Sequence, residues 1–308
     1  MNTKILFMGT DQHSGFILRY LLENNYNIVG CVSQPDKVQG RKKELTPTVV
    51  KTIANEYNIN VYQPANIKTD YQELLDIDYD VMLTVAYGQI IPEELLNNTK
   101  GLNVNVHYSL LPLYRGASPV QSAISNGDKT TGISIMEMVK KMDAGDVFIQ
   151  EQMEIEENDT TTTLFEKLNT KACKLLDQLF IDFENDKIKR TKQEEDKVTY
   201  TKMITKEDEH INFSINVDEV YNKIRSLLDY PGCYFMINDN RYKIIECYKD
   251  YNSSIIGSIS NVDKSGIYLG CEGGNIVVTK LQPAGKKPMD IKSYLNGKSE
   301  LSIGDVLD

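Results

Sequence analysis

Residues 4–33, with the sequence KILFMGTDQHSGFILRYLLENNYNIVGCVS, decide the fold that we expect. The apolar and β-branched runs Lys4–Met8 and Asn27–Ser33 predict two strands, and the stretch Ser14–Leu22 between them has the periodicity of a helix. Two strands joined by a helix form a βαβ unit, in which the strands run parallel. The start of the chain therefore favours a parallel sheet that helices cover on both faces.

The same alternation continues through the first half of the chain. Further strands are expected at 79–86, 103–107 and 132–139, and helices at 47–57, 117–125 and 164–183. Thr46 followed by Pro47 predicts a helix start, because a hydroxyl can cap the helix and proline suits its first position. The preceding residues, Lys37–Glu44, are expected to form an exposed loop. We predict an α/β fold with a Rossmann-like, mostly parallel sheet.

A change in composition marks a second domain. Residues 184–209 are rich in charge and poor in large aliphatic side chains, as in an exposed connection. Beyond them a helix is expected at 217–228 and strands at 233–237, 242–248, 255–259, 267–271 and 276–281. Short strands separated by turn residues predict a small, OB-like β-barrel. We therefore divide the chain into a first domain at 1–189, a linker at 190–206 and a barrel domain at 207–308.

The composition excludes several classes of protein. The 308 residues are 41% hydrophobic and 25% charged, as in ordinary folded chains, so disorder and disulfide mini-scaffolds are excluded. The net charge of −10 disfavours binding of polyanions over the whole surface, so any nucleic-acid contact must be local. No apolar run is long enough to cross a membrane. The five cysteines are widely spaced and form no CxxC motif, which favours a reducing cytoplasm.

The first strand-to-helix turn argues against a dinucleotide cofactor. Its sequence, Gly9–Gly15, is not G-x-G-x-x-G, and Asp11 would repel a pyrophosphate. A tight turn is the better interpretation, and NAD is a poor candidate. His13 lies in this turn, where a capping or surface role is commoner than a catalytic one.

The stretch Gly101–Gly116, GLNVNVHYSLLPLYRG, is the best candidate for a site. Its period-2 alternation places Asn103, Asn105 and His107 on one face of a strand. Any half-buried strand alternates in this way. Strands of a parallel sheet are usually apolar throughout, however, so polar side chains at the carboxyl end favour a ligand site. Asn105 and His107 could both donate a hydrogen bond to one carbonyl oxygen.

A carboxylate that orients the imidazole is expected after the strand at 132–139. Asp143 is the candidate and Asp146 is its rival, both in Lys141–Asp146 (KMDAGD). The alternative is an ordinary Asp-Gly turn, and the spacing alone does not separate the two.

These motifs resemble those of the formyltransferases that use 10-formyltetrahydrofolate. The likeness rests on Asn-x-His at 105–107, on SLLPLYRG at 109–116 and on MDAGD at 142–146. Within this superfamily the chain most resembles the branch that formylates methionyl-tRNA, because similar short motifs recur along almost the whole chain. They are FMGT at 7–10, AYG at 86–88, YTKMI at 200–204, YPG at 230–232 and LQPAGKK at 281–287. The last two lie in the second domain, which makes the likeness specific.

The resemblance implies the roles of several residues. The catalytic set would be Asn105, His107 and Asp143, and no metal would be needed. The folate co-substrate would contact Ser109, Leu110, Leu111 and Pro112, with Tyr87, Gln89, Ile90 and Ile91 along the pterin pocket.

The resemblance also implies a tRNA partner. Arg41, Lys42 and Lys43 match the basic loop that such enzymes place against the acceptor end of initiator methionyl-tRNA. Residues 207–308 hold eleven Lys and Arg against fifteen Asp and Glu, so the tRNA-facing surface there must be restricted. Lys286 and Lys287 are our candidates for it. We expect a monomer.

Three alternatives remain open at this stage. A related enzyme could formylate a different amine, such as a sugar nucleotide, or pass the formyl group to water. The chain could instead be a noncatalytic RNA-binding module, in which the barrel carries the function. A nicotinamide oxidoreductase is the third, and the first turn weakens it.

Overall fold

A computed structural model describes residues 2–39, 44–297 and 301–308, and every structural statement below concerns these residues. The chain divides into two compact units. Unit 1 consists of Met1–Gly116, Gly132–Met153 and Phe165–Tyr200, and unit 2 of Ala117–Thr131, Glu154–Leu164 and Thr201–Asp308. The chain therefore passes between the units several times. The expected linker at 190–206 contains the last of these passages.

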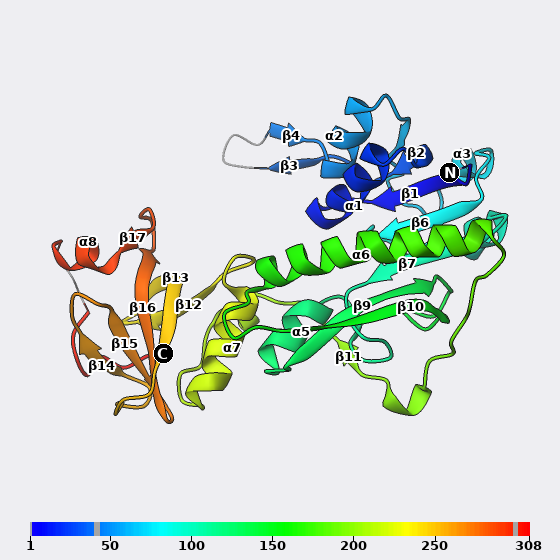
Figure 1. The fold of residues 1–308 in the computed structure, drawn as a ribbon. Helices are drawn as coiled ribbons and strands as arrows, with labels where there is room; N and C mark the ends of the chain where they lie inside the picture. The colour runs from blue at the N-terminus through cyan, green and yellow to red at the C-terminus, as the bar shows by residue number, and fades with distance from the viewer. Residues whose placement is uncertain (1, 40–43, 298–300) are drawn as a thin grey trace. The chain divides into compact units, whose positions relative to one another are not determined.

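A seven-stranded sheet forms the centre of unit 1 (Figure 1). Its strands, in spatial order, are β10 (Val147–Glu154), β9 (Thr130–Glu137), β7 (Leu102–His107), β6 (Val81–Val85), β1 (Lys4–Gly9), β2 (Asn27–Val32) and β5 (Val61–Tyr62). The pairs from β7 to β5 are parallel, whereas β9 runs antiparallel to β7. The expected α/β fold with a mostly parallel sheet is confirmed.

The helices of this region each bury apolar side chains. They are α1 (Gln12–Glu23), α2 (Val49–Glu56), α3 (Gln72–Leu75), α4 (Glu93–Asn98) and the long α6 (Thr161–Glu184). Figure 1 shows α6 lying along the sheet, and Leu168, Leu175 and Leu179 on its apolar stripe are buried. Among the described residues, no helix is long and apolar enough to cross a bilayer.

Two predictions about the segment before α2 are wrong. Thr46 ends strand β4 (Glu44–Thr46), which pairs with β3 (Lys37–Gln39), so the ends of the expected loop form a hairpin. The helix cap is Thr48, whose Oγ1 accepts a hydrogen bond from the N–H of Lys51 at 3.2 Å. Pro47 thus precedes the cap and does not begin the helix. Thr48 caps the helix because its extended backbone directs its hydroxyl back to the third helical N–H.

Unit 2 contains a curled antiparallel sheet and the helix α7 (Val217–Leu227). The strand order is β12 (Cys233–Ile237), β13 (Asn240–Asp250), β16 (Gly274–Pro283), β15 (Ile267–Cys271) and β14 (Ile259–Val262), with β17 (Met289–Asp290) paired to β16. Buried side chains such as Phe235, Ile244 and Leu269 form its core. The expected second fold, an antiparallel barrel-like sheet, is confirmed.

One expected strand of unit 2 is misplaced. The sequence predicts a strand at Ile255–Ile259, but β14 begins only at Ile259. Ile255 and Ile256 are about half exposed, at 49% and 54%, and Gly257 has a φ of +68° that interrupts an extended chain. Ile255 and Ile256 are therefore exposed residues of a turn.

The remaining short elements are β8 (Arg115–Gly116), α5 (Pro119–Ser125), β11 (Tyr200–Thr201), α8 (Ile291–Leu295) and the 3₁₀ turns η1 (Glu195–Lys197) and η2 (Glu207–Glu209).

Candidate active site

Strand β7 alternates as the sequence predicts, and its two candidate side chains differ in how they are held. Leu102, Val104 and Val106 are buried, whereas Asn105 is partly exposed. Among the described residues, no side-chain hydrogen bond is made by Asn105. Its amide is therefore available to a ligand. His107, two residues further on, is only 5% exposed and is held in place.

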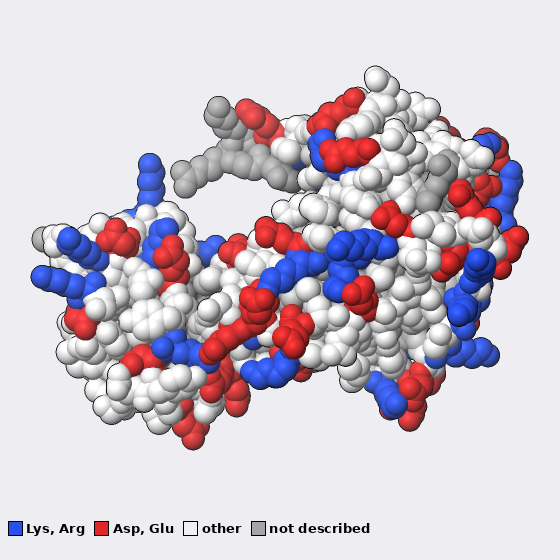
Figure 2. Space-filling view, in the orientation of Figure 1, with Lys and Arg blue, Asp and Glu red and all other residues white. Residues whose placement is uncertain are grey.

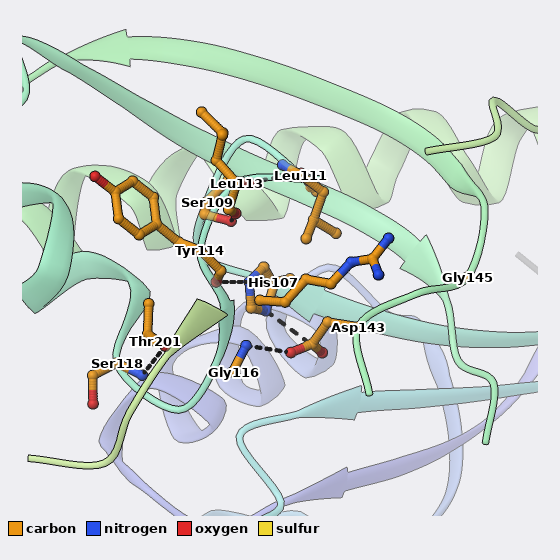
Figure 3. A network of polar contacts seen from close by, with 12 residues as sticks. His107, Ser109, Leu111, Leu113, Tyr114, Gly116, Ser118, Asp143, Gly145 and Thr201 are labelled. Atoms are coloured by element: carbon orange, nitrogen blue, oxygen red, sulfur yellow. Dashed lines mark hydrogen bonds and ion pairs between the residues drawn. The ribbon is translucent and has the colours of Figure 1, made fainter. Parts of the chain in front are cut away.

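Each ring nitrogen of His107 has a defined neighbour (Figure 3). Nε2 lies 2.9 Å from the carbonyl oxygen of Tyr114. Because a carbonyl can only accept, Nε2 carries a proton and donates it. Nδ1 lies 3.7 Å from Oδ1 of Asp143, which is longer than a direct hydrogen bond. Nδ1 is thus the nitrogen that can act on a ligand.

Asp143 reaches His107 by a route that the sequence does not predict. Because β9 is antiparallel to β7, its last residue Glu137 pairs with Val104 and not with His107. The following turn must come back along β7, and Asp143 adopts a left-handed φ of +50° in it. Its Oδ2 accepts a 2.8 Å hydrogen bond from the N–H of Gly116 (Figure 3).

The rival carboxylate, Asp146, lies at the end of this turn. Its backbone carbonyl accepts from the N–H of Glu137 and closes the hairpin. The structure brings Asp143, and not Asp146, to the imidazole.

The segment Ser109–Pro112 is fixed by its own hydrogen bonds. Ser109 is fully buried and its hydroxyl donates to the carbonyl of Leu113 at 2.6 Å. Ser134 on β9 accepts from the N–H of Leu111 at 3.1 Å and donates to the carbonyl of Ser109 at 2.6 Å. Leu110 and Pro112 are partly exposed. The hydroxyl of Ser109 is therefore a structural group of the loop in this state.

The segment after β6 presents little of its side chains. Tyr87 and Ile91 are buried in the core, where burial raises the pKa of the Tyr87 phenol. Gln89 accepts from the N–H of Ile67 at 2.9 Å through its Oε1. Ile90 alone of these four candidates is well exposed, at 65%. Of the expected side chains of this loop, the structure thus brings mainly Ile90 to the surface.

The first turn of the chain is closed by its own residues. Asp11 caps α1, with Oδ1 accepting from the N–H groups of His13 and Ser14 at 3.0 and 2.9 Å. His13 is therefore not the cap, and its partly exposed ring stacks on Phe165 with ring centroids 3.8 Å apart. Burial lowers its pKa, and its Nδ1 accepts from Asn169. The N–H groups of His13 and Ser14 in this turn are thus already bound to Asp11.

Comparisons with known proteins identify the family of the chain. Residues 2–179 match the family model described as formyl transferase, and residues 203–299 match the one described as formyl transferase, C-terminal domain. The chain is 42% identical over 309 residues to the methionyl-tRNA formyltransferase of Mesoplasma florum, covering 99% of both chains. The chain belongs to the methionyl-tRNA formyltransferase family. The resemblance drawn from the motifs is confirmed.

Two further comparisons bear on this formyltransferase. It is 41% identical to the methionyl-tRNA formyltransferase of Lactobacillus johnsonii, with 98% of both chains covered. Its fold is similar to the crystal structure of an N-formyltransferase from Helicobacter canadensis in complex with folinic acid and dTDP-3-aminofucose. The TM-score is 0.69 and the identity 20%, over 91% of this chain and 99% of the other. That likeness concerns the fold alone.

Two of the five candidate tRNA contacts of the formyltransferase, Lys286 and Lys287, lie within the described residues. Arg41, Lys42 and Lys43 are outside the described residues. Lys286 and Lys287 are exposed in the turn after β16, which a hydrogen bond from Gln282 Nε2 to the carbonyl of Lys286 closes at 2.8 Å. Figure 2 shows basic and acidic side chains interspersed over the face that it draws. No continuous basic area covers that face in the described part of the chain.

Sequence reasoning missed the groups that hold His107 and Asp143 of this formyltransferase in place. They are the N–H of Gly116, the buried Arg115 and the side chain of Gln193. Gln193 lies in a charged stretch that carries no periodicity or motif. Arg115 pairs with Glu195, and hydrogen bonds from Arg115 and Lys141 lower the pKa of Glu195 to about 2. Within the described ranges, no three His, Cys, Asp or Glu side chains are grouped to hold a metal ion.

Proposed function

We propose that this chain transfers the formyl group of 10-formyltetrahydrofolate to the α-amino group of methionine esterified to initiator tRNA. One observation carries the proposal. His107 and Asp143 face each other beside the available amide of Asn105, in a chain whose relatives at about 40% identity are named methionyl-tRNA formyltransferase. The reaction is an acyl transfer from one nitrogen to another.

The nucleophile of this reaction needs little activation. An α-amino group has a pKa of about 7.7–8.0 in model compounds, so a useful fraction is neutral at physiological pH. The difficult step is the negative charge that develops on the formyl oxygen when the amine attacks. The amide of Asn105 and Nδ1 of His107 would donate hydrogen bonds to this oxygen. Such a donor contributes roughly 2.7–4 kcal/mol where it has been removed in other enzymes.

The hydrogen-bond pattern defines the state in which His107 acts. Nε2 already donates to Tyr114, so Nδ1 can donate to the formyl oxygen only when the ring carries a second proton. Asp143, 3.7 Å away, would stabilise that positive charge and hold the ring's orientation. The separation leaves room for Nδ1 to turn its proton toward a ligand. Asp143, with water, would accept the proton of the attacking amine, and the doubly protonated His107 would give one to the leaving N10.

The loops after β6 and β7 expose apolar side chains that could pack against a flat, largely apolar ring system. Ile90 after β6 and Leu113 after β7 are exposed, at 65% and 40%, and β6 and β7 are parallel neighbours, so both loops leave the same sheet edge. We propose that the pterin lies along residues 86–91. Segment 109–112 would form the wall next to the formyl group. The comparison structure with folinic acid shares this fold.

The tRNA contacts form a separate part of the proposal. Arg41, Lys42 and Lys43 would bind phosphates at the acceptor end, with Lys286 and Lys287 as a second contact. Each phosphate contact should appear as a salt dependence. Arg41→Ala should raise the KM for tRNA and flatten its increase with salt, without changing the KM for folate. An unchanged KM for tRNA at all ionic strengths would remove Arg41 from the proposal.

The wider organisation of the enzyme also remains a proposal. We propose a catalytic domain at 1–189, a linker at 190–206 and a tRNA-binding domain at 207–308, working as a monomer in the cytoplasm. The five cysteines are free, as suits a reducing compartment. Light scattering of the purified chain checks the monomer, and limited proteolysis within 190–206 checks the division.

The deciding experiment mixes the purified chain with 10-formyltetrahydrofolate and charged initiator methionyl-tRNA. Formylmethionine recovered after deacylation is the expected product. Parallel reactions with an amino-sugar nucleotide, and with water as the only acceptor, separate the alternatives. Faster formylation of the sugar amine, or release of formate at the same rate without tRNA, would overturn the acceptor that we propose. Binding of tRNA without any folate-dependent product would favour a noncatalytic module.

A further inference from the structure

The stretch 191–199, within the connection expected to be merely exposed, makes an unusual set of contacts. Thr191 exchanges two backbone hydrogen bonds with Val147, at 2.8 and 2.9 Å. At the other end, the carbonyl of Thr199 accepts from the N–H of Arg115 at 2.9 Å, and its Oγ1 accepts from the N–H of Tyr114 at 2.8 Å. The stretch is thus fixed at both ends. One end lies on the strand after the Asp143 turn and the other on the loop after His107.

Gln193 lies between these ends, and every hydrogen-bonding position of its side-chain amide is occupied. Its Nε2 donates to the carbonyl oxygens of Asp143 and Gly145, at 2.8 and 2.7 Å. Its Oε1 accepts from Nε and Nη2 of Arg115, at 3.1 and 2.8 Å. Two donor hydrogens and two acceptor lone pairs are the full capacity of a glutamine amide. The side chain is half-buried, whereas its neighbours Lys192 and Glu194 are exposed.

The two groups that Gln193 joins are the two that hold the catalytic pair. Arg115 is fully buried and stands between Tyr114, which accepts from His107, and Gly116, which donates to Asp143. The backbone carbonyl of Asp143 itself is one of the two that Gln193 binds. A shift of this amide therefore changes the distance between Nδ1 of His107 and the carboxylate of Asp143.

From this geometry we propose that Gln193 is a positioning residue of the formyl-transfer reaction, which sets Asp143 against His107 through the two loops. This inference rests on the function proposed above. Gln193 itself touches no reacting atom. Its amide is required rather than a carboxylate, because Asp143 and Gly145 present two carbonyl oxygens that need donors. A glutamate would keep the contact to Arg115, lose both donated bonds and place a charge against two carbonyls.

The test compares Gln193→Glu, Gln193→Ala and the control Lys192→Ala in the full-length chain. We expect both Gln193 variants to lower kcat about 10- to 100-fold, since a misplacement of about 1 Å can cost about 10²-fold. The KM for tRNA should stay within twofold. Lys192→Ala, on the exposed side of the same stretch, should keep normal kcat. Normal kcat in Gln193→Glu would overturn the proposal.

A second measurement separates positioning from folding and does not depend on the substrate. The chain has three histidines, so ¹⁵N-histidine labelling gives a short spectrum, in which His107 is assigned by its loss in His107→Asn. The midpoint of the His107 titration should shift in Gln193→Glu while the melting temperature of the folded variant stays near that of the wild type. A lower melting temperature with an unchanged titration would assign Gln193 a structural role only. If the wild type formylates nothing, a shifted titration still supports the positioning, so the two proposals fail separately.

Discussion

The loops that follow β6 and β7 leave the same edge of the sheet but are built in different ways. After β6, Tyr87 and Ile91 return into the core and Gln89 binds the backbone of Ile67, so the chain offers mainly backbone. After β7, the imidazole of His107 lies beside the carboxylate of Asp143 and is tied to the loop that follows it.

The difference follows from what holds each loop. The loop after β6 is anchored by its own apolar side chains, so its exposed surface can be backbone. The loop after β7 is anchored by polar groups from distant segments, among them Ser134 and Thr199. Changes after β7 should therefore alter the chemical step, and changes after β6 should alter co-substrate binding or stability.

The strongest test of this contrast is His107→Ala. Removing the imidazole removes one donor to the formyl oxygen and the proton carrier, so kcat should fall by about 10²–10⁴-fold. Single-turnover formylation of methionyl-tRNA measures the loss, and filter binding measures the tRNA affinity, which should stay nearly intact. His210→Ala, which lies in unit 2 and stacks on Tyr234, serves as the control. Weak tRNA binding with normal chemistry would reverse the assignment of His107.

Asp143→Asn should have the next largest effect. An asparagine can still accept from the N–H of Gly116, so the turn should fold, but the charge beside Nδ1 is lost. We expect kcat to fall about 10²-fold, because the positive charge that His107 carries during the reaction loses its partner. The pH profile of kcat, compared with that of Asp146→Asn, measures this. An equal loss in both variants would mean that the turn, and not the carboxylate of Asp143, matters.

The sequence predicted the parallel sheet, the antiparallel second sheet and the place of His107 for identifiable reasons, whereas the choice of Asp143 over Asp146 came from the family resemblance. Strand and helix periods are local properties, and polar residues at 105 and 107 contradict the apolar pattern of a buried strand. Gln193 could not be found in this way. Its role comes from carbonyl groups that lie 48 and 50 positions away along the chain, and a charged stretch gives no signal for such contacts.

Two wrong predictions also arose because contacts that are distant in the sequence determine local structure. Thr46 and Thr48 offer equal capping hydroxyls in the sequence, and only the pairing of β3 with β4 decides that the helix starts after the second. Likewise, the sequence of Ile255–Ile259 does not distinguish a strand from an exposed turn. Local propensity does not determine the secondary structure of a segment where backbone pairing with a distant part of the chain does.

Gly88→Ala should have a smaller effect, confined to the loop after β6. Gly88 has a φ of +84°, and an added Cβ would lie 2.4 Å from Nε2 of Gln34, which donates to the carbonyl of Tyr87. We expect the KM for 10-formyltetrahydrofolate to rise several-fold, kcat to stay within about twofold, and stability to fall by roughly 1 kcal/mol. Gly304→Ala, with a φ of +90° and open space around it, controls for backbone strain alone. A loss of kcat at unchanged KM would contradict the contrast between the loops.

Tyr87→Phe should have the smallest effect and decides what the buried ring does. Its hydroxyl is buried and lacks a hydrogen-bond partner among the described residues, so removing it relieves a desolvation cost and leaves the packing of the ring intact. We expect the free energy of unfolding in urea to be unchanged or to rise by up to about 1 kcal/mol. The KM for folate should not change, because the ring lies in the core and the carbonyl of Tyr87 keeps its bonds from Thr10 and Gln34. A raised KM would show instead that the phenol reaches the pterin, which would make the loop after β6 a side-chain site like the one after β7.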